Sequence, residues 1–319
     1  MKKIILIGGT SYSGSTLLDL MLSNDDAGFS CGEIYALFIP SRVDHLRPKC
    51  ICGDPSCDIW KAIEKLGKNN CYEGLFSKFR DLNFIVDSSK DFIWIRDQVY
   101  NLTHKKIYFK NLLIWKSPAE FALSCLKRGK FGNWRDSWVN YHKRYLSVVD
   151  EFIPIRYSKL ITNTEPSLKS LCSMIDIPYF KGKEAYWQKK HHTLFGSISA
   201  KLHLYEQNAA GYNKIKDEIG RHQIKSHCTN TDNKKIHRTI YSEDYSNHDM
   251  RRSVDEQIIK DYELRKILEI LEAISDNSMN YSSLKNEIKK IGVSRTYVFI
   301  TKYRKLVRSH ILRKKHSIF

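Results

Sequence analysis

The sequence has no apolar run long enough to cross a membrane. No stretch approaches the ~18 apolar residues that a spanning helix needs. A secretory signal is also missing, because the run Ile4–Ile7 is too short and meets Gly8-Gly9. Cysteine is sparse as well, and 8 in 319 residues excludes a small disulfide-stapled scaffold. We therefore expect a cytoplasmic protein without a transmembrane segment.

Acidic residues are scarce at the C-terminal end. From Tyr281 to Phe319 there are 11 Lys and Arg against one acid, Glu287, so this tail carries +10 of the formal net charge of +18. The rest of the chain is only moderately basic, as suits an anion-binding enzyme. The expected plan is an α/β domain over 1–275, with a Cys-containing insertion at about 45–62 and a polar insertion at about 203–236, followed by a basic helical tail over 276–319.

Four short apolar runs are each followed by a polar turn and then by helical spacing. Apolar residues at successive positions favour strands that are covered on both faces. Strands that alternate with helices imply parallel pairing. We expect a three-layer α/β/α domain around a central parallel sheet, with a helical basic C-terminal extension. The four runs are Lys3–Ile7, Phe84–Val86, Leu112–Trp115 and Phe152–Ile155.

Apolar stripes at helical spacing predict four helices. One stripe begins just after Gly14, and Ser117-Pro118 is typical of the cap and first turn of a second helix. Thr164-Glu165-Pro166 opens a third helix. The fourth stripe runs from Leu264 to Ile274.

A glycine-bearing loop lies between the first run and the first stripe. Gly9 and Gly14 have the spacing of a P-loop, whose backbone N–H groups and following helix N-terminus face an anion. Ser15, however, stands where the P-loop lysine should be. That lysine reaches the β- and γ-phosphates, so its absence argues against an ordinary ATPase or kinase. The G-x-G-x-x-G pattern of dinucleotide-binding proteins is absent too.

The segment Ser13-Gly14-Ser15-Thr16, followed by Leu17-Leu18, resembles the 5′-phosphosulfate loop of the PAPS-dependent sulfotransferases. PAPS is 3′-phosphoadenosine 5′-phosphosulfate. The resemblance implies a P-loop-like fold. It also implies that the donor is bound by Tyr12, Ser13, Gly14, Ser15 and Thr16. Tyr12 departs from the family pattern, which has Arg or Lys there. We therefore expect another cation to neutralise the transferring group.

A second segment resembles the same family. Lys116-Ser117-Pro118 follows an apolar run, and Ser124 comes eight residues after Lys116. The family has an Arg-x-Pro-like turn here, with a Ser at that distance, and the resemblance implies that Lys116 and Ser124 bind the 3′-phosphate. His191–Gly196 resembles a degenerate form of the family's late glycine loop. The implied basic contact to the 3′-phosphate then falls to Lys201 or Arg238.

Sulfuryl transfer is an in-line displacement, so a cation must face the transferring group and a base must take the acceptor's proton. The resemblance implies Lys90, in the turn after the second apolar run, for the cation. Glu33, in a C-G-E segment, is the first candidate for the base, and Asp87 is the second. Three histidines remain open as alternatives, namely His45, His104 and His142.

Three thiols lie within eight residues, at Cys50, Cys52 and Cys57. No metal is expected, because lysines can neutralise the transferring group; zinc bound by these thiols, with Cys31, His45 or Cys71 as the fourth ligand, is the less favoured alternative. A disulfide and a packed loop are the alternatives that the spacing leaves open.

Two other classes of function are weighed against a sulfotransferase. A P-loop nucleotide-binding protein or kinase is opposed by the missing lysine. The tail around Gly292 resembles a helix-turn-helix only faintly, so nucleic-acid binding is the less favoured explanation of its charge. The acceptor cannot be read from the sequence, and a carbohydrate such as a polysaccharide is slightly favoured by the habit of the family.

Overall fold

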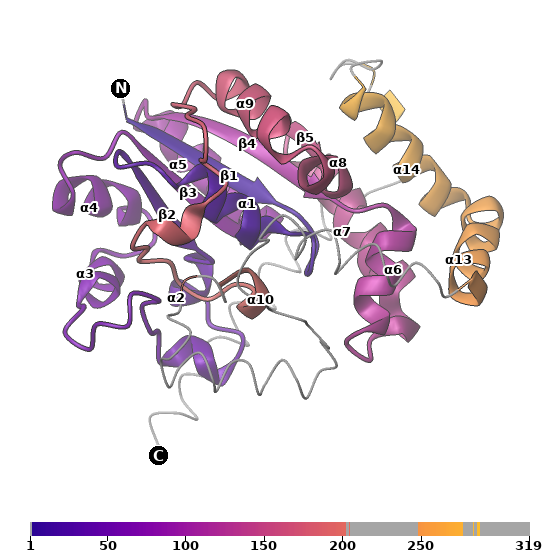
Figure 1. Ribbon diagram of the computed structural model, residues 1–319, viewed down its shortest axis with the longest axis horizontal. Coiled ribbons are helices and arrows are strands. Elements are labelled where there is room, and N and C mark those ends of the chain that lie inside the picture. The colour runs from indigo at the N-terminus through magenta and orange to yellow at the C-terminus, as the bar shows by residue number, and fades with distance from the viewer. Residues whose placement is uncertain (1, 202–203, 205–247, 277–282, 284–285, 288–319) are drawn as a thin grey trace.

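A five-stranded, all-parallel sheet forms the centre of the computed structural model (Figure 1). The structure describes residues 2–201, 204, 248–276, 283 and 286–287. Arg238, nearly all of the insertion at 203–236 and most of the basic tail lie outside these residues. The strand order is β2-β3-β1-β4-β5, with bounds β1 Lys3–Gly8, β2 Gly28–Gly32, β3 Phe84–Lys90, β4 Tyr108–Trp115 and β5 Ile153–Arg156.

Helices cover both faces of the sheet, which confirms the expected α/β architecture (Figure 1). Along β1, Ile4 and Leu6 join the core on one face, and Ile5 and Ile7 join the core on the other. The second face is covered by α1 Ser15–Leu22, α8 Tyr157–Thr162 and α9 Thr164–Met174. The first is covered by α3 Ile59–Leu66, α4 Cys71–Lys78, α5 Phe92–His104, α6 Pro118–Leu126, α7 Trp134–Val148, α13 His248–Lys260 and α14 Tyr262–Ser275.

Several helices begin where a side chain satisfies the free backbone N–H groups of the first turn. Ser117 and Glu120 form a reciprocal capping box at α6, with Pro118 in the first turn. Asp91 accepts hydrogen bonds from the first turn of α5, and Asp261 does the same for α14. The four helices predicted from apolar stripes are confirmed as α1, α6, α9 and α14.

Strand β2 is an element that the apolar runs did not predict. Its five residues are all buried, but only Phe29 has a large apolar side chain. Helical spacing was expected after the second run, where α5 lies, but α7 was not predicted. The remaining short helical segments are α2 Tyr35–Phe38, η1 Val43–Leu46, η2 Phe131–Asn133, η3 Tyr186–Gln188 and α10 Ile198–Lys201.

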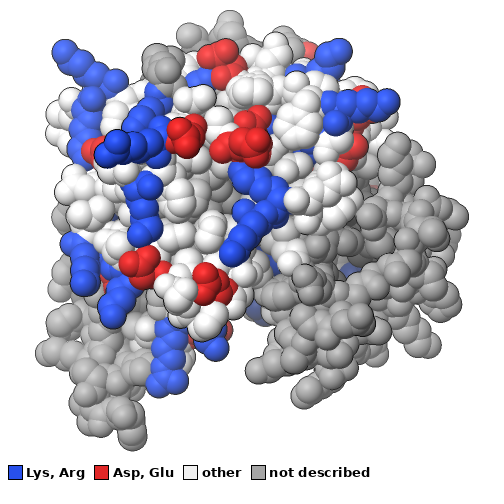
Figure 2. All heavy atoms as spheres, turned by 60° about the vertical axis from the view of Figure 1, so that its left-hand side comes forward, with Lys and Arg blue, Asp and Glu red and all other residues white. Residues whose placement is uncertain are grey.

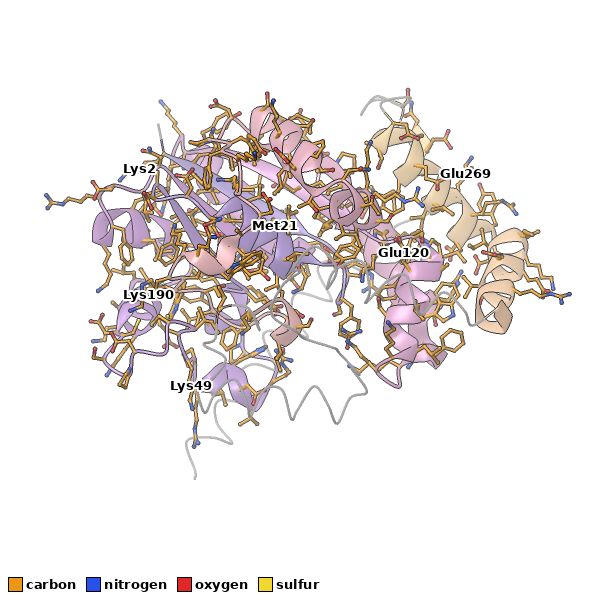
Figure 3. All side chains as sticks on the ribbon, in the orientation of Figure 1. Lys2, Met21, Lys49, Glu120, Lys190 and Glu269 are labelled. Carbon is orange, nitrogen blue, oxygen red and sulfur yellow. The ribbon has the colours of Figure 1, made fainter. Side chains whose placement is uncertain are left out.

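Side chains fill the space between the layers, with Met21 over the middle of the sheet and Lys2 and Glu269 at the periphery (Figure 3). On the face in Figure 2, Lys and Arg are interspersed with Asp and Glu, so that face of the described protein carries no field of one sign. In the described part of the chain, no helix combines the length and the apolarity needed to pass through a bilayer.

Candidate functional site

The sheet order brings together the turns that the sequence singled out. Strand β1 lies between β3 and β4, so the loop after β1 emerges between the turns that end the other two strands. In open α/β sheets, ligands bind at the carboxyl ends of the strands where the order reverses direction. The loop at Gly9–Gly14, the turn at Lys90 and the turn at Lys116 all lie at this edge.

The loop between β1 and α1 has the backbone of an anion site. Gly14 has φ 95°, and Tyr12 has φ 69°, a left-handed conformation that is costly for a residue with a side chain. The hydroxyls of Thr10 and Ser13 are buried and have no hydrogen-bond partner among the described residues. Buried hydroxyls without partners are rare, and their presence singles out these two side chains of the loop.

Lys116 and Ser124 lie in contact at the end of β4. The Lys116 ammonium is 3.1 Å from Ser124 Oγ, and both side chains are buried. The same ammonium lies 4.4 Å from the centre of the Tyr157 ring. A Cβ atom on Gly14 would come within 2.3 Å of that ring, which explains why a glycine is needed here. One aromatic ring therefore touches both the loop and the lysine.

Two cations that the sequence reasoning missed lie over Tyr12, where the family has a basic residue. The Arg128 guanidinium is 4.3 Å from the Tyr12 ring centre, and the Lys130 ammonium donates to the Tyr12 hydroxyl at 2.9 Å. Arg128 also donates to the carbonyl oxygen of Ser124 at 2.8 Å. The only feature of the sequence that could have indicated these two cations is the basic run at 127–130, which follows α6.

No family model matches this chain, and no curated protein matches it either. It is similar in structure to two sulfotransferase domains. One comes from the curacin biosynthetic pathway, with 16% identity, a TM-score of 0.46, and coverage of 75% of this chain and 97% of that domain. The other comes from the olefin synthase of Synechococcus PCC 7002, with 14% identity, a TM-score of 0.42, and coverage of 69% and 94%. Both likenesses are distant, so the function proposed below is inferred from the residues of the site.

Glu33 and Lys90 form an ion pair between the ends of β2 and β3, and both side chains are less than one-fifth exposed. Burial alone would raise the pKa of Glu33, but the charge and hydrogen bond of Lys90, together with the charges of Arg42 and His45, bring the pKa below its ordinary value. Lys90 has φ 64° and is therefore strained in the same way as Tyr12. Both residues had been singled out from the sequence.

Lys201 lies on α10, where the charge of Glu33 acts on it. Burial lowers the pKa of the Lys201 amine, and Glu33 opposes that shift. The assignment of Lys201 or Arg238 to the 3′-phosphate stays a prediction. Because the charge of Glu33 acts on Lys201, we consider this lysine together with Glu33 and Lys90, and these three residues are called the Glu33 cluster below.

Asp87 is fully engaged inside the protein. One carboxylate oxygen accepts from the Tyr72 hydroxyl at 2.6 Å and from the Trp94 indole at 2.8 Å. The other accepts from the backbone N–H of Ser89 at 2.8 Å and from its hydroxyl. Burial raises the pKa of Asp87, and these donors oppose that shift. Such contacts describe an anchor for the end of β3, and they favour Glu33 over Asp87 as the base.

Tyr141 on α7 joins two turns of the site, and sequence reasoning did not single it out. Its hydroxyl accepts from the Gly9 backbone N–H at 2.6 Å and donates to the Lys90 carbonyl oxygen at 2.5 Å. The strained turn at Lys90 is thereby tied to the start of the loop Gly9–Gly14, which is called the phosphate loop below after the role proposed for it. A tyrosine in an amphipathic helix gives no sign of this contact in the sequence.

The three histidines differ in their positions. His45 is close enough to Glu33 to act on its charge, but its ring nitrogens already contact Arg42 and Ser41. His142 is buried, and burial lowers its pKa to about 4. His104 ends α5, which precedes the amino end of β4, so it lies at the opposite edge of the sheet.

Proposed function

We propose that this protein is a sulfotransferase that moves a sulfuryl group from PAPS to a hydroxyl or amine of an acceptor. The observation that carries the proposal is the closeness of the phosphate loop to the Lys116 and Ser124 pair. Tyr157 packs against Gly14 and under Lys116, and Arg128 reaches both Tyr12 and Ser124. A single nucleotide with phosphates at both its 5′ and 3′ positions has the chemistry to use both halves.

The loop residues are assigned to the 5′ end of the donor. Backbone N–H groups at the start of α1 and the hydroxyls of Thr10 and Ser13 supply neutral donors. Arg128 and Lys130 supply the positive charge that Tyr12 cannot. We therefore assign these two cations the role that the family gives to the basic residue at the position of Tyr12.

The Glu33 cluster is assigned to the transfer itself. The acceptor oxygen or nitrogen attacks sulfur, and the bond from sulfur to the phosphate oxygen breaks. The acceptor's proton goes to the carboxylate of Glu33, which Lys90 keeps ionised. The ammonium groups of Lys90 and Lys201 stabilise the negative charge that develops on the sulfuryl oxygens and the leaving phosphate.

An ATP-dependent kinase is the rival that the same loop must be tested against. Besides the missing lysine, the Thr16 hydroxyl oxygen accepts from the Ser197 backbone N–H at 3.0 Å. In P-loop NTPases the residue at this position binds Mg²⁺ through its hydroxyl. This contact supports a nucleotide site that works without that magnesium ligand.

Calorimetry with the native chain tests the proposal. PAP, the product nucleotide left after transfer, should bind without Mg²⁺, and ATP should bind far more weakly with or without it. Tighter binding of ATP with Mg²⁺ than of PAP would refute the sulfotransferase assignment.

Transfer of sulfur-35 from PAPS then identifies the acceptor. The panel should contain polysaccharides, which we propose as the first class to try, together with lipid, peptide and small hydroxylated acceptors. A Glu33→Gln variant that still binds PAP but has lost transfer would support Glu33 as the base. Undiminished transfer by this variant would exclude that role.

A further inference from the structure

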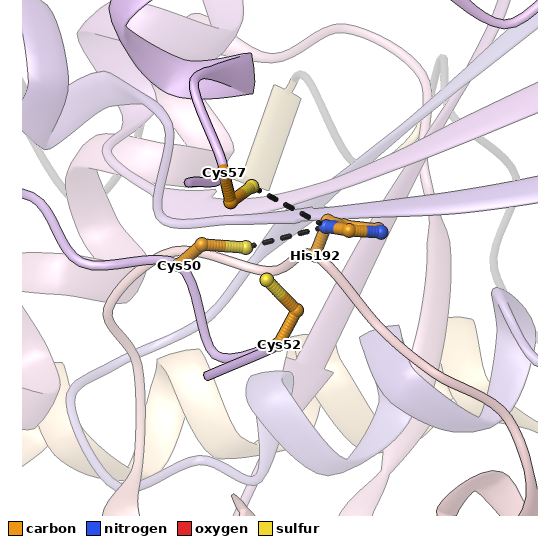
Figure 4. A group of neighbouring side chains, drawn as sticks. All are labelled: Cys50, Cys52, Cys57 and His192. Carbon is orange, nitrogen blue, oxygen red and sulfur yellow. Dashed lines mark hydrogen bonds between the residues drawn. The ribbon is translucent and has the colours of Figure 1, made fainter. Parts of the chain in front are cut away.

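Four potential metal ligands converge at one point outside the nucleotide site. They are the thiols of Cys50, Cys52 and Cys57 and the imidazole of His192, which are drawn in Figure 4. Their ligand atoms all lie within 4.8 Å of one another. His192 Nδ1 is 3.4 Å from the Cys50 sulfur and 3.7 Å from the Cys57 sulfur. The three cysteines come from the insertion before α3, and the histidine lies more than 130 residues later.

The two nitrogen–sulfur distances match a tetrahedral zinc site. With Zn–S bonds of about 2.3 Å and Zn–N bonds of about 2.0 Å, tetrahedral geometry places the ligand atoms about 3.5–3.8 Å apart. A disulfide would instead bring two of the sulfurs to about 2.0 Å. The seven cysteines that the structure describes all carry free thiols.

The backbone holds the two segments side by side. The Ile51 N–H donates to the Thr193 carbonyl oxygen at 3.3 Å, so the residues next to the ligands are hydrogen-bonded. Gly53, with φ 74°, and the bond from Cys57 N–H to the Asp54 carbonyl oxygen turn the insertion back on itself. This turn returns Cys57 to the same side as Cys50.

The aromatic core positions the histidine ring independently of any metal. The His192 ring is parallel to that of Phe29 within 1°, at a centroid distance of 6.4 Å, and lies 6.2 Å from Phe79. Its Nδ1 faces the thiols (Figure 4). Packing of this kind fixes ring orientation, which a metal ligand requires.

We propose that Cys50, Cys52, Cys57 and His192 bind one Zn²⁺ as a structural site. Three thiolates and a neutral imidazole complete the four-coordinate shell that structural zinc prefers and leave no position for a substrate. Three thiolates and one Zn²⁺ would give the site a net charge of −1. The positive charge of Lys190, which is close enough to act on His192, would partly offset it. Soft thiolate ligands favour zinc over magnesium or calcium.

The fourth ligand is none of the three that the sequence suggested. Cys31 lies buried in β2, and Cys71 lies buried at the start of α4, where its thiol contacts the Lys68 carbonyl oxygen. The His45 ring contacts Arg42 and lies 4.7 Å from the Phe195 ring at an interplanar angle of 51°. His192 completes the set because the chain returns to the end of β2 after α9.

The metal would join the cysteine insertion to a segment that borders the active site. The Leu194 carbonyl oxygen accepts from Glu33 N–H at 3.0 Å, and Gly196 packs against Thr16 of α1. Zinc at His192 therefore restrains the chain that runs between the Glu33 cluster and the phosphate loop. Its role is to hold that wall in place, and the chemistry of transfer does not pass through it.

Metal analysis of the full chain tests the proposal without any activity measurement. The purified protein should contain close to one zinc per chain. The Cys57→Ser and His192→Ala variants should lose most of it, but His192→Cys should retain it because a four-cysteine site also binds zinc. Cys172→Ser, which removes a buried thiol on the far face of the sheet, should keep the full zinc content.

Cobalt substitution tests the geometry. Co²⁺ exchanged into the site should give the intense visible bands of a tetrahedral ion and a thiolate charge-transfer band, and both should disappear in Cys57→Ser. Four results would overturn the proposal: a metal-free native protein, bound iron in place of zinc, an octahedral cobalt spectrum, or equal zinc in native protein and His192→Ala. Chelation should also lower the melting temperature of the native chain and leave that of His192→Ala unchanged.

Discussion

Replacing Lys116 by Met offers a test of the 3′-phosphate site that separates binding from folding. Lys116 is buried, and its ammonium lies 3.1 Å from Ser124 Oγ. A charge-assisted hydrogen bond to a phosphate contributes about 1.5–3 kcal/mol. Because about 1.4 kcal/mol is tenfold in affinity, the variant should bind PAP about 10- to 150-fold more weakly. Ser124→Ala removes only a neutral hydrogen bond and should weaken PAP binding by about 2- to 10-fold.

The assay compares PAP with AMP, which lacks only the 3′-phosphate. Calorimetry of both nucleotides gives a ratio of affinities that isolates this group. Lys116→Met should reduce the ratio and leave AMP binding unchanged, because AMP engages only the phosphate loop. Lys183→Met is the matched control, since Lys183 is an equally buried lysine that contacts Asn24 and Asp25 instead. The reasoning fails if both nucleotides weaken equally, or if the control reduces the ratio as much.

Three further changes test other parts of the site. Lys90→Met should slow transfer by about 10²–10³-fold. It should also move the acid limb of the pH profile upward, because burial then raises the pKa of Glu33 against the charges of Arg42 and His45 alone. An unmoved limb would exclude Glu33 as the titrating base. Asp87→Asn weakens the hydrogen bonds from Tyr72 and Trp94, so it should lower the free energy of unfolding, measured in urea, by about 1–3 kcal/mol and leave the turnover of the folded protein unchanged. If turnover were lost and stability were native, Asp87 would instead have a catalytic role. Arg128→Ala should weaken PAP binding by about tenfold, and the exposed Lys61→Ala should not; equal effects would indicate a general charge effect.

The strands could be predicted where burial on both faces leaves a continuous apolar run. The runs at Lys3–Ile7 and Leu112–Trp115 are the cores of β1 and β4, whose residues there are all buried. Strand β2 could not be found in this way. Its residues, Gly-Phe-Ser-Cys-Gly, are buried because their small side chains let neighbouring segments of the backbone approach closely. Gly32, for example, packs against the backbone of Leu194.

The site could be predicted where its residues are close in sequence. Lys116 directly precedes α6 and Ser124 lies in the second turn of that helix, so their contact follows from a short spacing. Tyr141 and His192 could not be assigned, because each meets its partners only after more than 50 residues of intervening fold. No local pattern distinguishes such residues from an ordinary core tyrosine or a surface histidine.

The position of β1 at the centre of the sheet also governs how the chain can fold. Lys3 pairs with Phe84 on one side and with Tyr108 on the other, so β1 gains its first neighbour only after about 80 further residues have been made and its second only after about 100. Pairing over such separations is slow, because long loops must close first. Until then β1 is an apolar segment with two open edges, which is a hazard for aggregation during synthesis. A fragment that ends before Trp115 should therefore need a chaperone to stay in solution.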